Sequence, residues 1–402
     1  MNIFENGFLN EFKIAQENLR VARLASPASV NFGNQGLAGQ RPIPIIQTAL
    51  GLTSDTNFAL NLDRGEAGSL ASSIATNATR MDNLVRAGYP ANFFRVNPTT
   101  GSGGAWLVIN GGNSTYNALQ VEVRRRMSSG LLVQGSYAWA KSLSNMLASS
   151  SAVASQPTTL RDYGLDKGPS PWDIRHGFKL NFIYELPFGP GRWLLAGTHS
   201  AVVKRILEGW EIAGVSRIQS GSPELLTGRA TFNQNDNGVV FQNMTARDYQ
   251  KMVKIRKTTA PNGVGVIYFL PQEFINNTLA AWEAGGFTLA NLDRSKPYIG
   301  PQTEPGKLGH RLYTYGFWQH RWDLSLVKRT RISEGKAIEL RAQFLNAFNN
   351  TNFLLGGAGN EVNTQGIGAA FGQITDSYRD ISVSGTNDPG GRLIEFVLRF
   401  TF

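Results

Sequence analysis

The sequence predicts an all-β fold: a transmembrane antiparallel β-barrel to which the chain contributes the carboxy-terminal strands, with long extracellular loops and a short amino-terminal helix. Apolar and polar residues alternate in seven segments, so each predicted strand has one apolar and one polar face. The links between these segments are compact and long in turn. A membrane-spanning helix is not expected, because it needs about 18 apolar residues and the most apolar stretch, 43–52, is interrupted by Pro44 and Gln47.

The first strand shows the pattern, since Leu119, Val121 and Val123 alternate with Gln120 and Glu122. Three residues ending in glycine, Ser128 to Gly130, then form a credible tight turn into the second strand. The predicted strands are 119–127, 131–140, 178–186, 210–219, 322–326, 338–344 and 393–402.

Alternation of apolar and polar residues also occurs in soluble β-sheets, so the lengths of the links are what distinguish a membrane barrel here. They are compact at 128–130, 188–208 and 333–335 and long at 141–175, 220–320 and 349–391. Bacterial outer-membrane barrels have short periplasmic turns and long extracellular loops, so the carboxy terminus is predicted to be periplasmic. A complete barrel has an even strand number and both termini in the periplasm. This chain has seven predicted strands, and the region before the first strand is predicted to begin on the extracellular side. We therefore expect the chain to be the end of a larger barrel.

Two regions follow from this division. Residues 1–113 are predicted to be an extracellular-loop region with one amphipathic helix, because apolar residues from Phe4 to Leu19 recur at intervals of three and four. Residues 114–402 are predicted to hold the transmembrane strands.

The polar strand faces are predicted to line a wet lumen and the apolar faces to meet lipid. Carboxylates on the polar faces lie near Arg or Lys, which favours salt bridges over acid/base catalysis. The lumen-facing candidates are Glu122, Arg124, Lys179, Asn181, Glu211, Arg217, Asp323, Glu339, Arg341, Glu395 and Arg399. Aromatic residues near strand ends suit a membrane-interface girdle. They are Tyr137, Trp139, Tyr184, Trp210, Trp318, Trp322 and Phe402.

Other chemistries are not favoured. The chain has no cysteine, four widely spaced histidines and neither a nucleophile elbow nor a phosphate loop, so we expect no enzyme activity, no metal site and no cofactor. A net charge of +10 suggests nucleic-acid binding as a hypothesis. The basic clusters at 124–126 and 254–257 do not favour it, because they are short and lie outside any binding motif. His176, at the start of a strand, is expected to join a hydrogen-bond network at the barrel rim.

Several segments resemble the carboxy-terminal barrel of Oar-like TonB-dependent receptors of the acidobacterial type. They are NIFENGFLNEF at 2–12, YNALQVEVRRRMSSGLLVQGSYAWAKSLSN at 116–145, DIRHGFKLNFIYELPFGPGRW at 173–193, GWEIAGVSRIQSGSP at 209–223, FLNAFNNTNF at 344–353 and the final RLIEFVLRFTF. The resemblance implies a barrel of about 22 strands and a plug domain that is not seen in this sequence. It also implies that the barrel-assembly machinery recognises the last strand through Phe396, Leu398, Phe400 and Phe402.

The leading hypothesis is an outer-membrane barrel of a TonB-dependent receptor that takes part in substrate uptake. Its expected partners are outer-membrane lipid, the assembly machinery, the TonB system only through the missing plug region, and an unknown small ligand such as a siderophore, glycan or peptide. Loop aromatics such as Trp282, Tyr298 and Tyr313 would suit any of these ligands. A passive pore or a structural or adhesive outer-membrane protein is the main alternative, and a secreted carbohydrate-binding β-protein is a third.

Overall fold

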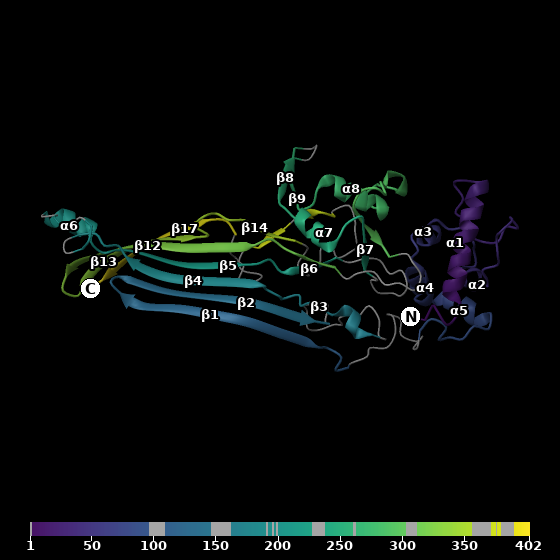
Figure 1. The fold of residues 1–402 in the computed structure, drawn as a ribbon, viewed down its shortest axis with the longest axis horizontal. Coiled ribbons are helices and arrows are strands. Elements are labelled where there is room, and N and C mark those ends of the chain that lie inside the picture. Colours follow the sequence, from purple (N-terminus) through teal and green to yellow (C-terminus); the bar gives the residue numbers. More distant parts are fainter. Residues whose placement is uncertain are drawn as a thin grey trace.

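A computed structural model describes residues 2–95, 109–145, 162–189, 192–194, 197, 200–226, 238–259, 263–302, 312–355, 371–374, 376–378 and 390–402. Its largest element is an antiparallel sheet in which seven long strands pair strictly in sequence order (Figure 1). These strands are β1 (Ser114–Ser128), β2 (Leu131–Ser144), β4 (His176–Glu185), β5 (Trp210–Gln219), β12 (Gln319–Ser333), β13 (Lys336–Leu345) and β17 (Leu393–Thr401). All seven strands predicted from alternation are confirmed.

The sheet is open in the part of the chain that the structure describes. Strand β1 pairs only with β2, and β17 pairs only with β13. A short strand, β3 (Gly168–Pro169), extends the far end of β2. Because pairing is sequential and antiparallel, all compact links lie at one end of the sheet and all long links at the other.

The tightest link is a two-residue turn. Ser128 pairs with Leu131, and the two residues between them, Ser129 and Gly130, have φ angles of 52° and 76°. Positive φ at both positions matches the right-handed twist of a hairpin, and it makes the loop one residue shorter than the predicted three. At the corresponding turn after β12, Gly335 has a φ of 80°. The compact link after β4 contains a helix, α6 (Ala201–Leu207), that the alternation did not indicate.

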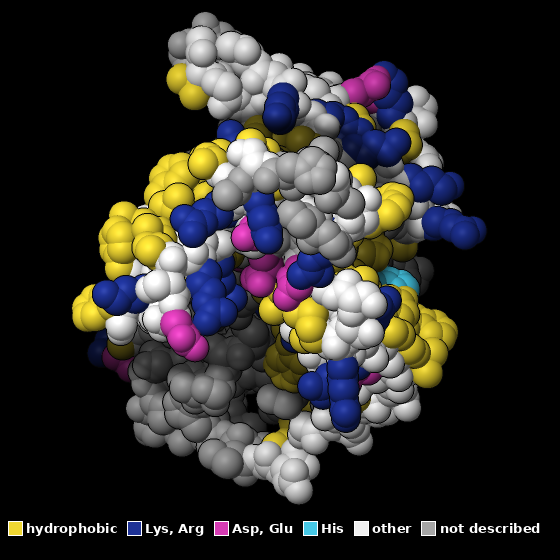
Figure 2. Space-filling view, turned by 90° about the vertical axis from the view of Figure 1, so that its left-hand side faces the viewer, with side chains coloured by type: hydrophobic (Ala, Val, Ile, Leu, Met, Phe, Trp, Pro, Cys, Tyr) yellow, Lys and Arg dark blue, Asp and Glu magenta, His cyan; other side chains and the backbone are white. Residues whose placement is uncertain are grey.

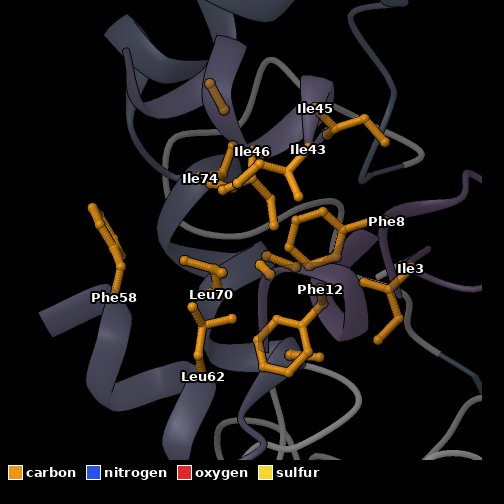
Figure 3. Close-up of a cluster of buried hydrophobic side chains, with 14 of the residues drawn as sticks. Ile3, Phe8, Phe12, Ile43, Ile45, Ile46, Phe58, Leu62, Leu70 and Ile74 are labelled. Carbon is orange, nitrogen blue, oxygen red and sulfur yellow. The ribbon is translucent and has the colours of Figure 1, made fainter. Parts of the chain in front are cut away.

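Residues 2–95 form a helical subdomain where sequence analysis expected one helix in a loop region. The expected helix is α1 (Phe8–Ala25), and four more follow: α2 (Pro44–Leu50), α3 (Thr56–Asp63), α4 (Ala67–Ala75) and α5 (Ala78–Arg86). Phe8 and Phe12 of α1 point into a core that also receives Ile46, Leu62 and Leu70 (Figure 3). The subdomain therefore has its own hydrophobic core.

One buried carboxylate joins two of these helices. Glu11 of α1 accepts hydrogen bonds from the backbone N–H groups of Ile45 and Ile46, at 3.0 and 2.5 Å, in the first turn of α2. Those N–H groups have no partner within their own helix, and a negative charge is favourable at a helix N-terminus. Burial nevertheless raises the pKa of Glu11, and the two hydrogen bonds only partly oppose the shift.

Two of the long links, from β5 to β12 and from β13 to β17, fold into a second body, which we call the loop subdomain. It contains the small sheets β6 (Pro223–Leu226) with β11 (Leu312–Tyr315), β7 (Val239–Gln242) with β10 (Tyr298–Pro301), β8 (Arg256–Thr259) with β9 (Gly265–Tyr268) and β15 (Gln373–Ile374), and β14 (Asn352–Leu354) with β16 (Asp376–Tyr378). It also contains α7 (Ala246–Met252), α8 (Gln272–Ala281) and the single turn Leu289–Asn291. A further 3-10 turn, Tyr163–Asp166, precedes β3.

The loop subdomain has its own core, built around Trp282, Phe269 and Phe274. Leu355 and Phe371, from the link between β13 and β17, pack into the same core. Figure 1 places both subdomains at the end of the sheet opposite the carboxy terminus. They touch where Arg64 donates to the backbone carbonyl of Glu283 at 3.2 Å and approaches its carboxylate at 3.8 Å.

Candidate functional site

The polar face of the sheet is the first candidate surface. The strand register places all eleven predicted lumen-facing residues on this one face, on β1, β4, β5, β12, β13 and β17. One row across the sheet shows the order: Glu122, Ser136, Lys179, Arg217 and Arg321 pair successively from β1 to β12. Three neighbouring strands therefore bring three basic side chains into one row.

Carboxylates on this face are bound by basic or polar neighbours. Glu339 accepts from Arg329 of the adjacent strand and from Arg341 of its own strand, each at 2.8 Å. Asp323 pairs with Arg321 at 3.1 Å and accepts from the backbone N–H of Asn346 at 2.7 Å. These contacts are the salt bridges expected from the sequence. They stabilise a charged wall in which Glu339 and Asp323 already have partners.

The opposite face is apolar and exposed. On β17 the side chains of Phe396, Leu398 and Phe400 are more than half exposed, and Phe402 is 97% exposed. Soluble proteins rarely expose so continuous an apolar surface. Seen from the compact-link end, hydrophobic side chains gather on both outer flanks, and several acidic side chains lie between them (Figure 2).

Aromatic side chains mark both ends of the apolar face. At the long-link end His176 accepts from or donates to the Tyr137 hydroxyl at 2.8 Å and stacks on Trp318, with ring centroids 5.7 Å apart. This is the rim network expected for His176. At the other end of β4 lies Tyr184, eight residues away, or about 26 Å along the strand. That span agrees with an apolar band about 25 Å tall between two aromatic girdles.

A polar cluster that sequence analysis did not single out fixes the long links to the sheet. The buried Asp173 accepts from the backbone N–H of Ser142 at 2.6 Å and pairs with Arg175 at 3.3 Å. Arg175 also donates to the Tyr315 hydroxyl at 3.2 Å. Burial raises the pKa of Tyr315, and the Arg175 charge partly opposes the shift. The signal was present in the quoted segment DIRHG, whose Asp and Arg precede a strand.

The loop aromatics do not form the ligand surface that the sequence suggested. Trp282 is fully buried, and its indole N–H donates to the carbonyl of Ile299 at 2.7 Å. Tyr298 is buried as well, while Tyr313 is partly exposed. Trp282 and Tyr298 hold the loop subdomain together, because long links with enough apolar residues can form their own core.

The described residues contain no cluster of His, Asp or Glu that could hold a metal ion. Among the same residues, no helix is long and apolar enough to cross a membrane. His199 and His310 lie outside the described residues.

Comparison with known families decides the class of protein. The family model described as "Outer membrane beta barrel domain" matches residues 49–384. The chain belongs to this family. Its place is therefore the bacterial outer membrane, and the open antiparallel sheet is part of a barrel wall. Searches among curated proteins and among solved structures gave no match.

Proposed function

We propose that this outer-membrane barrel belongs to a TonB-dependent receptor of the Oar-like type and takes part in the uptake of a small ligand. The proposed roles are distinct: the loop end captures the ligand, the polar sheet face lines its route, and the apolar face meets membrane lipid. The part we propose for the residues described is capture and passage, and coupling to TonB would require a plug region. We propose no catalytic role.

The folded loop end carries this proposal. The long links form a subdomain with its own buried core, and the helical subdomain contacts it through Arg64 and Glu283, so the loop end offers a folded surface on which a ligand could bind. Pre-formed structure lowers the entropic cost of holding a ligand compared with loops that must first become ordered. The segments quoted above from residues 2–12 to the last strand support the more specific assignment by resemblance.

Polar-face chemistry supports passage of a hydrated solute. The wall combines paired carboxylates with the basic row Lys179, Arg217 and Arg321, and a water-filled interior of this kind is typical of outer-membrane barrels. Siderophores, glycans and peptides remain the candidate ligand classes.

The test is uptake by the native bacterium with the gene deleted and then restored. Loss of growth on one ligand class, together with loss of uptake when a protonophore removes the energy source, would support an energised receptor. Uptake that continues with the protonophore would indicate a passive pore, and normal uptake with lost surface attachment would indicate an adhesin.

A variant pair ties the result to the loop subdomain. Trp282→Ala removes the central side chain of its core, whereas Trp172→Ala alters an exposed tryptophan of another long link. Capture should fall for Trp282→Ala and stay unchanged for Trp172→Ala, at equal amounts of barrel in the membrane. Equal uptake by both variants would contradict capture by the loop subdomain.

A further inference from the structure

The compact link between β4 and β5 carries an exposed amphipathic helix. In α6, Val202 is 68% exposed, Ile206 is 58% exposed and Val203 is also exposed. Lys204 and Arg205 are exposed on the same short helix. A helix of seven residues is not stable alone in water, so its position must be set by contacts with the rest of the chain.

Those contacts come from the apolar face of the sheet. The Lys328 ammonium of β12 donates to the backbone carbonyls of Arg205, at 2.6 Å, and Glu208, which end α6. The indole N–H of Trp210 donates to the carbonyl of Ile206 at 2.8 Å. Positive charge is favourable at a helix C-terminus, and the terminal carbonyls otherwise lack partners.

Lys328 is unusual for its place in the register. It pairs with Trp210 on one side and Leu340 on the other, on the face that carries the exposed apolar side chains. A charged residue on that face is costly in hydrocarbon unless its head reaches the interface or a polar group. Here the ammonium lies 5.5 Å from the centre of the Trp210 ring and ends on the carbonyls of α6. Lys328 thus fastens α6 to the edge of the lipid-facing surface.

The edge concerned is the periplasmic one. Figure 1 shows α6 beyond the strand ends on the same side as the carboxy terminus. The same link also exposes Trp193, at 85%, and Arg192. Tryptophan, aliphatic and basic side chains together are the composition of segments that lie at a membrane surface.

We propose that α6 and Trp193 lie in the headgroup region of the inner leaflet of the outer membrane, where Lys204 and Arg205 contact anionic phospholipid. Two features favour lipid over a periplasmic protein. The helix is continuous with the apolar sheet face through Lys328 and Trp210, and the charge of its exposed basic pair is complementary to phosphate. An anchor of this kind would set the depth of the barrel in the membrane.

The test uses the natural absence of cysteine. Val202→Cys carries an environment-sensitive fluorophore in the full chain, refolded into vesicles of phosphatidylethanolamine with phosphatidylglycerol. Glu334→Cys, in the polar turn at the same end of the sheet, is the matched control. We expect lipids brominated near the headgroup to quench the label at position 202 and not the label at 334.

A second variant separates the two parts of the proposal. Lys204→Glu with Arg205→Glu should reduce lipid quenching at position 202 in anionic vesicles, with β-sheet circular dichroism unchanged. Quenching that does not respond to this double change, or that is equal in purely zwitterionic vesicles, would overturn the contact with anionic lipid. Access of position 202 to iodide alone, in every vesicle composition, would overturn the membrane anchor and leave the surface to a periplasmic protein.

Discussion

An arginine introduced on the apolar face of β4 should destabilise the folded protein, whereas an arginine introduced on the polar face should not. Leu180 lies midway between the aromatic ends of β4, four residues from His176 and four from Tyr184. Its cross-strand neighbours on the apolar face are Gly135 and Ser216, so Leu180→Arg gains no carboxylate partner. An arginine near the bilayer midplane on the lipid side of a barrel costs about 2 to 4 kcal/mol.

Asn181→Arg is the matched control, because it introduces the same side chain one residue away on the polar face. Its neighbours across the strands are Gln134 and Val215, and its side chain is exposed. We expect a change within about 0.5 kcal/mol, as for other exposed positions. The cost of Leu180→Arg alone corresponds to roughly 30- to 700-fold in the folding equilibrium, since about 1.4 kcal/mol is tenfold.

The assay is refolding from urea into phosphatidylcholine vesicles, with folded protein measured by circular dichroism and protease protection. Leu180→Arg should shift the urea midpoint downwards, whereas Asn181→Arg should refold like the unaltered chain. Equal midpoints for the two variants would refute the assignment of the faces.

Three further predictions concern other parts of the chain. Deleting Phe402 should lower outer-membrane abundance, measured by surface labelling, because the exposed apolar end of β17 is the proposed assembly signal; unchanged abundance would contradict that role. Trp282→Phe should cost the loop subdomain about 1 to 3 kcal/mol, because it leaves the buried Ile299 carbonyl unpaired; faster proteolysis of the loops with normal barrel yield would verify this. Burial raises the pKa of Glu11, so the native state holds this proton more tightly, and the stability of the helical subdomain should decrease as pH rises from about 4.5 through the raised pKa. Amide exchange in α2 should show this slope in the unaltered chain, and Glu11→Gln should remove it.

The strands could be predicted because their signal is local. Alternation such as Phe178, Leu180 and Phe182 depends only on neighbouring residues pointing to opposite faces of a strand. It located the seven long strands of the main sheet but not the two-residue strand β3. The observed pairing of each strand with its neighbours in sequence agrees with links that are compact and long in turn. Arg341, one partner of Glu339, was likewise implied by its place on the same predicted strand face, whereas the other partner, Arg329, lies beyond the predicted strand 322–326.

The helical subdomain was missed beyond its first helix, although its helix ends carry signals. Asp55 caps α3 by accepting from the backbone N–H groups of Asn57 and Phe58, and Asn77 caps α5. Pro44 begins α2, and Gly51, with a φ of 67°, ends it. These helices are only seven to nine residues long, so apolar periodicity has few turns in which to show and capping residues were better evidence.

The burial of Trp282 could not be read from the sequence. Its hydrogen-bond acceptor, Ile299, lies 17 residues away, and the core around it receives Leu355 and Phe371 from a different long link. Such contacts depend on how two links meet in space. The contact between Lys328 and α6 could not be predicted for the same reason, since the helix and the lysine are more than 100 residues apart in sequence.

The central claim is that one face of the sheet meets lipid while the other is wet, and a cysteine scan along β4 from Gly177 to Tyr184 tests it most directly. A spin label at each position, in the chain refolded into vesicles, reports collisions with oxygen, which concentrates in lipid, and with a water-soluble nickel chelate. We predict a period of two, with oxygen access at 178, 180 and 182 and nickel access at 177, 179 and 181. An absent or reversed alternation would contradict the account.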